Sequence, residues 1–224
     1  MKKLYLLFLI MTAVFAGCSR EIKIFSIGEK KIHSKMERVI YPEFRKSTVV
    51  ADKINSDILL RATDMKRNWK YTDEIETLKF FSDYDIKFRE EEIISIRFDE
   101  TVYLSDTSRP YKEIKSITLN TDTGMEYSFS DFFKKNSNYK EFINSYIKDY
   151  IKIRNIDMLR EFGEIDENQE FYLTESAFVV YYQPYVYTTR SYGPLIIYLP
   201  YDKVKKMIDK DYIELFTEYK EERE

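Results

Sequence analysis

The sequence predicts an α+β fold in which mainly antiparallel sheets, built from hairpins, pack against amphipathic helices in two small subdomains. Apolar and polar side chains alternate over residues 84–88 and again over residues 94–98, and this period of two is typical of half-buried strands. Between Asn138 and Arg154 the apolar side chains instead recur every three or four residues, as on one face of a helix. Hairpins interrupted by such helices are typical of α+β proteins.

Composition excludes several classes of protein. The 224 residues include 36 Lys and Arg against 39 Asp and Glu, a net charge of −3. We therefore expect no nucleic-acid partner that is held by bulk positive charge. With one His and one Cys, a disulfide within the chain and a His/Cys metal cluster are both excluded. We expect neither a metal site nor a cofactor.

The first residues have the pattern of a secretion signal. Lys2 and Lys3 precede an uncharged apolar run over residues 4–15, which is shorter than the roughly 20 residues of a membrane-spanning helix. Two small residues then precede Cys18, and the segment resembles a bacterial lipoprotein box. We expect a signal peptide over residues 1–17 and lipid attachment at Cys18. The alternatives are an ordinary secretory leader with a chance cysteine, or an uncleaved anchor.

A lipid on Cys18 predicts an extracytoplasmic protein that is anchored to the bacterial membrane. Ser19 after the cysteine resembles an outer-membrane sorting signal, if the cell has two membranes.

Residues 18–30 are expected to form a tether and residues 31–119 the N-terminal subdomain. The expected elements of this subdomain are a strand within 31–44, a helix capped by Ser47 with Val50, Ile54 and Ile58 on one face, a hairpin of 84–88 and 94–98 across the turn 90–92, and a strand with Ile117 and Leu119.

Residues 120–209 are expected to form the C-terminal subdomain, and residues 210–224 a charged tail. The expected elements are a turn at 121–124, a returning strand at 125–129, the helix at 138–154, an acidic linker at 161–170, a hairpin of 171–174 and 177–182, a strand at 195–199 and a short helix that begins at Pro200.

Short ordered motifs in the last third of the chain, at 170–176, 179–185 and 197–201, resemble the C-terminal domain of RsiV-type, lysozyme-responsive anti-sigma factors. The same domain pair occurs before PdaC-type peptidoglycan deacetylase domains. Residues 51–55 and 94–98 resemble the partner domain that precedes it, so the resemblance covers about residues 35–209. It implies an extracytoplasmic, non-catalytic module that is associated with the cell wall or with lysozyme.

The residues themselves predict no catalytic site. His33 lies among lysines and is expected to be solvated, without the positioned partner that a general base needs. The stretch after Asn120 departs from a calcium loop because Met125 stands where glycine makes the sharp turn. The acidic residues within 161–170 are expected to be solvated. A carboxylate-dependent cell-wall hydrolase or deacetylase, an accessory to one, and a structural lipoprotein remain as alternatives.

The loop over residues 184–194 is the candidate binding site. It holds Tyr185, Tyr187 and Tyr192 together with Arg190, between two apolar strands. Tyrosine offers a large rigid face with a polar tip, which suits stacking on a sugar or contact with a protein. The expected partner is a cell-wall glycan or an envelope protein, such as a lysozyme-like protein. In the alternative interpretation these rings pack back on the edge of the sheet.

Replacement of Cys18 by Ser should abolish incorporation of labelled palmitate, because only the thiol can take the diacylglycerol. The measurement is labelling of cells that express each form, followed by isolation of the protein. Equal labelling of both forms would contradict lipidation at this residue.

Overall fold

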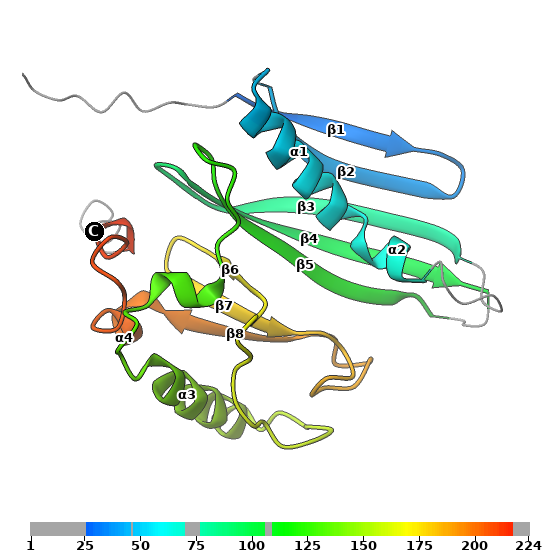
Figure 1. The fold of residues 1–224 in the computed structure, drawn as a ribbon. Helices are drawn as coiled ribbons and strands as arrows, with labels where there is room; N and C mark the ends of the chain where they lie inside the picture. The colour runs from blue at the N-terminus through cyan, green and yellow to red at the C-terminus, as the bar shows by residue number, and fades with distance from the viewer. Residues whose placement is uncertain (1–25, 46, 70–76, 106–108, 217–224) are drawn as a thin grey trace, which may run out of the picture.

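The computed structural model describes residues 26–45, 47–69, 77–105 and 109–216 (Figure 1). The predicted signal peptide and Cys18 lie outside these residues. The described chain forms two sheets, of five and three strands, together with helices, and this confirms the predicted α+β class. Within the described part, none of the helices combines the length and apolar character that crossing a bilayer would require.

The larger sheet follows chain order, from β1 (Ile27–His33) through β2 (Glu37–Phe44), β3 (Thr77–Glu90) and β4 (Ile93–Leu104) to β5 (Tyr111–Asn120). Neighbouring strands are antiparallel except β2 and β3, which run parallel. The helices α1 (Val49–Ala62) and α2 (Asp64–Trp69) lie between β2 and β3 in the sequence, and a parallel pair needs such a crossover.

Helix α1 covers one face of the larger sheet (Figure 1). Its buried residues Ile54 and Ile58 belong to a core that includes Phe80, Ile96 and Val102 from β3 and β4. Alternate residues of the strands point to this core because side chains of a strand alternate between its two faces.

The smaller sheet packs against the other face of the larger one. It contains β6 (Phe171–Leu173), β7 (Ala177–Tyr182) and β8 (Leu195–Pro200), all antiparallel, and α3 (Tyr139–Ile153) covers its outer side (Figure 1). On β7, Phe178 and Val180 belong to the core with α3, whereas Val179 and Tyr181 belong to a core between the sheets. The chain then enters the short helix α4 (Tyr201–Val204).

Hydroxyl groups join the two sheets. The Ser116 hydroxyl on β5 donates to the carbonyl oxygen of Phe171 (2.6 Å), and the Leu173 amide donates to Ser95 Oγ on β4 (2.9 Å). Ser95 also bonds Thr118 at 2.8 Å. Phe171 and Leu173 lie on β6, an edge strand whose outward backbone groups would otherwise be buried without partners, which is costly.

Three expectations at the start of the chain need correction. The predicted strand within 31–44 is a hairpin of β1 and β2, and β1 begins at Ile27, inside the predicted tether 18–30. The side chain that caps α1 belongs to Thr48 rather than Ser47, since its hydroxyl accepts the Ala51 amide at 3.1 Å.

Two further corrections concern the C-terminal half. Residues 125–129 do not form a strand: Glu126 makes a single bridge to Leu119, and a 3-10 turn over Phe129–Phe132 follows. The predicted tail 210–224 contains a second 3-10 turn, Glu214–Phe216, and the Phe216 ring stacks on Tyr201 with 4.4 Å between centroids. Tyr212, Ile213 and Leu215 also pack against the core that contains Phe216, and the charged residues around them concealed the apolar contact in the sequence.

We call the buried contact of Ser95 and Ser116 with Phe171 and Leu173 the seam. Replacement of Ser116 by Ala should lower the free energy of unfolding by about 1–3 kcal/mol, because the Phe171 carbonyl and the Tyr181 hydroxyl both lose a hydrogen-bond partner in this seam. The measurement is urea denaturation. Ser130→Ala is the matched control, since Ser130 is exposed and should stay within about 0.5 kcal/mol of wild type. Equal stability of the two variants would contradict the role given to the seam.

Candidate functional site

A cleft of about 560 Å³ lies between the start of β5 and the loop 184–194. Pockets that take small ligands commonly have volumes of a few hundred Å³. Three prolines and three tyrosines form much of its wall. The lining residues are Arg109, Pro110, Tyr111, Lys112, Glu113, Pro184, Tyr185, Arg190, Ser191, Tyr192, Gly193 and Pro194.

The loop side of the cleft is held by its own hydrogen bonds. Thr188 is fully buried, and its hydroxyl donates to the Gly193 carbonyl at 2.7 Å. The Tyr185 amide donates to the Thr188 carbonyl at 2.8 Å. Tyr185 itself has a φ of +69°, a left-handed conformation that non-glycine residues seldom adopt. Such strain persists only where the surroundings fix the backbone, and it is found preferentially at functional sites.

Gln183 ties the start of this loop to the edge of β5. Its side-chain oxygen accepts the Ile114 amide at 3.1 Å, and its side-chain nitrogen donates to the Ile114 carbonyl at 2.5 Å. The amide side chain therefore bonds the β5 backbone as a residue of a neighbouring strand would. This fixes both walls of the cleft relative to one another.

Three of the four predicted binding residues come together in the cleft. Tyr185 and Tyr192 are 58% and 51% exposed, and Arg190 lies over the ring of Tyr111 with 3.9 Å from the guanidinium carbon to the ring centroid. Arg190 also donates to the Arg109 carbonyl. Sequence reasoning missed Tyr111 because no local pattern links the start of β5 to a distant loop.

Tyr187, the fourth predicted residue, does not line the cleft. Its ring packs edge-on against Tyr182, with 4.9 Å between centroids, and against Phe162 at 5.5 Å. Arg160 covers the ring at 5.1 Å. For this residue the alternative interpretation, in which the ring packs back on the sheet, is correct.

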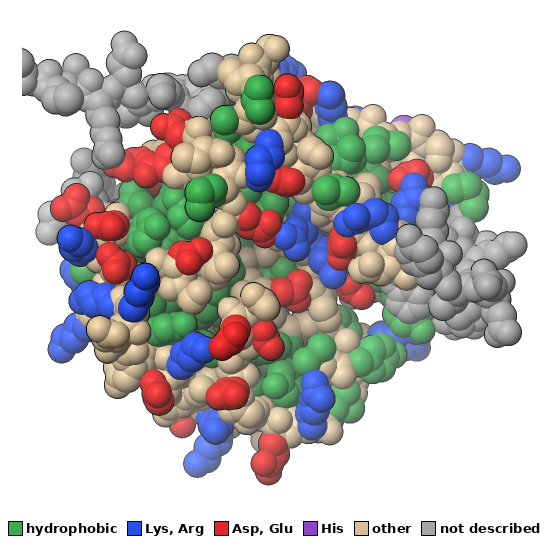
Figure 2. Space-filling model, viewed as in Figure 1, with side chains coloured by type: hydrophobic (Ala, Val, Ile, Leu, Met, Phe, Trp, Pro, Cys, Tyr) green, Lys and Arg blue, Asp and Glu red, His purple; other side chains and the backbone are tan. Residues whose placement is uncertain are grey.

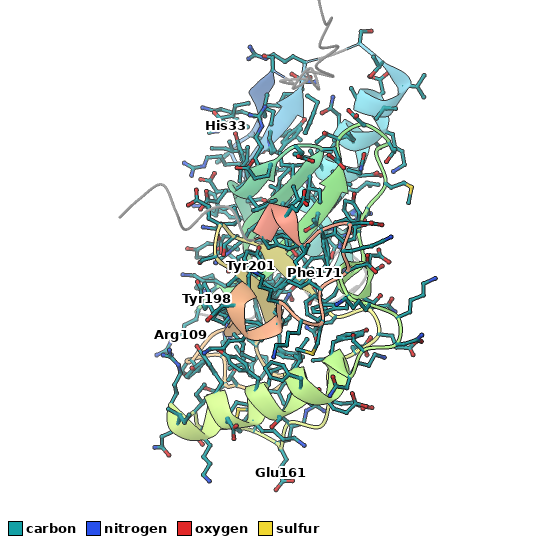
Figure 3. All side chains as sticks on the ribbon, turned by 90° about the vertical axis from the view of Figure 1, so that its left-hand side faces the viewer. His33, Arg109, Glu161, Phe171, Tyr198 and Tyr201 are labelled. Carbon is teal, nitrogen blue, oxygen red and sulfur yellow. The ribbon has the colours of Figure 1, made fainter. Side chains whose placement is uncertain are left out.

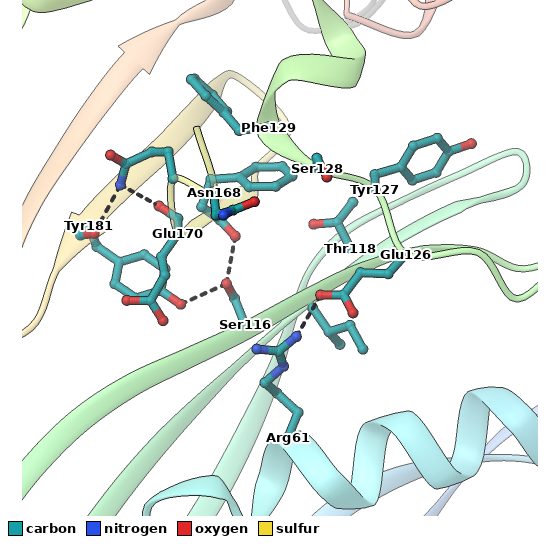
Figure 4. Close-up of a pocket in the computed structure, with 13 residues that line it drawn as sticks. Arg61, Ser116, Thr118, Glu126, Tyr127, Ser128, Phe129, Asn168, Glu170 and Tyr181 are labelled. Carbon is teal, nitrogen blue, oxygen red and sulfur yellow. Dashed lines mark hydrogen bonds and ion pairs between the residues drawn. The ribbon is translucent and has the colours of Figure 1, made fainter. Parts of the chain in front are cut away.

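A second cavity, of about 360 Å³, lies between the sheets (Figure 4). Its polar groups bond one another: Arg61 pairs with Glu126 at 2.6 Å, and Ser116 bonds Tyr181 at 2.8 Å. Glu170 lines it, and burial raises the pKa of this carboxyl group. Because Ser116 belongs to the seam, we assign this cavity to the joint between the sheets rather than to a ligand site.

The most perturbed carboxyl group belongs to Glu100 on β4. Its side chain is 1% exposed, and burial raises its pKa to about 7. One oxygen accepts the Met65 amide at 2.8 Å, and Lys115, Asp64 and Glu113 contribute nearby charge. A substrate could not reach this group without opening the core, so Glu100 does not define a catalytic site.

The other sequence candidates lie apart. His33 and Glu161 are at opposite ends of the molecule (Figure 3), so they cannot act as an acid–base pair. Glu161, Glu164, Asp166 and Glu167 are exposed, as expected for a solvated acidic stretch. The expectation is wrong for Glu170, which is half-buried and accepts a hydrogen bond from the Gln183 side chain. Across the described ranges, no three His, Cys, Asp or Glu residues are placed to hold a metal ion. Acidic and basic side chains are interspersed on the face shown in Figure 2.

The architecture and cleft define a two-sheet α+β protein with an aromatic cleft on its surface. Residues 130–202 match a family model described as protein of unknown function (DUF3298). This match confirms a domain of unknown function in the C-terminal half, while the finer RsiV-type grouping and the pairing with PdaC-type domains stay predictions. No curated protein matches the sequence.

Solved structures with the same fold include two DUF3298 proteins. A DUF3298 family member from Bacteroides fragilis NCTC 9343 is 12% identical with a TM-score of 0.60, and the alignment covers 86% of this chain and 97% of that one. A DUF3298 family protein from Pseudomonas aeruginosa PAO1 is 9% identical with a TM-score of 0.63, with 87% and 98% covered. At these identities the likeness concerns the fold alone.

Stability should fall as the pH rises through the pKa of Glu100. The folded-state pKa, about 7, lies above the ordinary value of 4.5, so folding favours the protonated form. This contribution is complete below about pH 4.5 and is lost as the pH passes 7; it amounts to roughly 3 kcal/mol.

The measurement is urea denaturation at pH 5 and pH 8. Glu100→Gln keeps the volume and cannot ionise, so it should remove most of the difference between the two pH values. An equal pH dependence in the variant would show that another group causes it.

Proposed function

We propose that the chain is an extracytoplasmic lipoprotein, anchored through Cys18, whose folded part is a non-catalytic module that binds a cell-wall glycan. The cleft between β5 and the loop 184–194 is the binding site in this proposal. The resemblance to RsiV-type proteins supports the same setting, at the cell wall. A protein released through a signal peptide and held by a lipid would meet wall polymers directly.

The observation that carries the proposal is the display of Tyr185 and Tyr192, both more than half exposed, on a loop that is already fixed. A tyrosine ring presents a rigid apolar face with a polar tip, and such a face stacks well on the apolar face of a sugar. Because Thr188 and Gln183 hold the loop, binding would require little additional ordering.

The shape of the site favours a glycan over a protein partner. A cleft of about 560 Å³ is in the range of small-ligand sites, whereas a stable protein interface buries about 800 Å² on each partner. An envelope protein, such as a lysozyme-like protein, is the second candidate, because the family resemblance includes lysozyme-responsive proteins.

The charges in the cleft argue against the hydrolase alternative. Glycoside hydrolysis commonly uses two carboxyl groups about 5–10 Å apart across the scissile bond. Among the residues described as lining the cleft, Glu113 alone is acidic, and Lys115 pairs with it at 3.1 Å. Among those described residues, a glycan bound in the cleft would meet no second carboxylate.

Tyr185→Ala and Tyr192→Ala should each weaken retention of the purified chain on isolated cell walls by about tenfold or more, since exposed aromatic anchors contribute roughly 2 kcal/mol. The measurement is co-sedimentation with walls over a range of wall concentrations. Thermal unfolding should barely change in these two variants.

Tyr187→Ala is the matched control. Its ring is packed, so truncation should lower stability by about 2 kcal/mol while retention of the folded protein on walls persists. Failure of the wild type to bind walls, or full retention of both cleft variants, would overturn the proposal. Binding of lysozyme but not of walls would favour the protein partner.

A further inference from the structure

A second pair of exposed aromatic rings lies on the face of the larger sheet opposite α1. Phe81 on β3 and Tyr103 on β4 meet edge to face, with 5.9 Å between centroids, and are 37% and 40% exposed. Their strand neighbours Phe80 and Val102 point the other way, into the core under α1. Strand alternation therefore places this aromatic pair on the open face, where nothing in the core requires it.

The strand register connects this pair to the cleft. Lys112, which lines the cleft, is opposite Thr101 on β4, and Thr101 is opposite Phe81 on β3. Directly opposite residues share a face of the sheet, and neighbouring strands are about 4.8 Å apart. Phe81 therefore lies roughly 10 Å from Lys112 across the sheet. The cleft and the aromatic pair are parts of one surface.

Cations flank the aromatic rings along this surface. Lys79 is opposite Tyr103, and both Lys79 and Lys112 are exposed. Among the residues that the structure describes, no Asp or Glu forms an ion pair with either lysine. In the cleft, Arg109 and Arg190 add two further cations, while Glu113 forms an ion pair with Lys115.

We propose that the cleft and the pair Phe81 and Tyr103 form one extended surface that binds an acidic glycan chain, with carboxylate or phosphate groups. The inference rests on the proposed function and adds the charge and the length of the ligand. The aromatic rings would stack on sugar faces, and the lysines between them would attract the acidic groups. Because the chain as a whole has a net charge of −3, an acidic polymer is repelled elsewhere and directed to this surface.

The test measures binding of the full chain to polygalacturonate, poly(glycerol phosphate) and neutral dextran. We expect at least one acidic polymer to bind at least tenfold more tightly than dextran, and long chains more tightly than short oligomers. The tighter of the two acidic polymers identifies the anionic group. Raising the salt concentration should weaken this binding.

Variants separate the two parts of the surface. Phe81→Thr and Lys112→Gln should weaken binding of long acidic chains by about tenfold, and Phe81→Thr should leave binding of short oligomers unchanged. Lys148→Gln on α3 and Met125→Thr, both at exposed positions outside this surface, are matched controls and should bind as wild type does.

Suppose that Phe81→Thr and Lys112→Gln bind long chains as the wild type does while Tyr185→Ala loses binding. That result would overturn the extended surface but leave the glycan-binding cleft intact. If dextran bound as tightly as the acidic polymers, the ligand would not be acidic, but the extended surface would still stand. Absence of binding to any glycan and to isolated walls would overturn the proposed function itself.

Discussion

Each sheet of this molecule has an edge strand whose outward backbone groups need partners, and the groups that satisfy them determine the rest of the arrangement. The outer edge of β5 is bonded by the side chain of Gln183 at Ile114, and by the Tyr127 amide, which donates to the Thr118 carbonyl at 2.8 Å. The outer edge of β6 is bonded by the hydroxyls of Ser95 and Ser116. An unpaired buried backbone group costs about as much free energy as a lost hydrogen bond. These hydrogen bonds from side chains and a loop therefore hold the smaller sheet in one position on the larger one.

The candidate site follows from this joint. Gln183 directly precedes the loop 184–194, and its two bonds to Ile114 place that loop beside the start of β5. Arg190 can then lie over Tyr111, and the left-handed backbone of Tyr185 can be maintained with its ring in solvent. Binding residues are thus carried by an irregular segment, whereas their positions are set by two rigid sheets, as is common for functional loops.

Sequence periodicity predicted the elements well and their partners poorly. The helix at 138–154 and the hairpins around 84–98 and 171–182 agree with α3, β3 with β4, and β6 with β7, because burial on one face imposes a period on the residues. The parallel pairing of β2 with β3 has no such signature, because alternation fixes which face is buried and not which strand lies beside it. The same limit applies to the site. The sequence does not distinguish the three tyrosines of the loop from one another. The contacts of Tyr187 with Phe162 and Tyr182 show that this ring is packed, whereas the other two are exposed.

Gln183 closes the edge of β5 at Ile114 and thereby builds the cleft. Amide hydrogen exchange at Ile114 tests it most directly, because this amide donates to the Gln183 side chain and to no strand. We predict slow exchange at Ile114 in the wild type and fast exchange in Gln183→Leu. Ile117, whose amide faces β4 by strand alternation, should stay protected in both proteins. Equal protection of Ile114 in the two proteins would show that a group other than Gln183 closes this edge and would contradict the role of Gln183 in building the cleft.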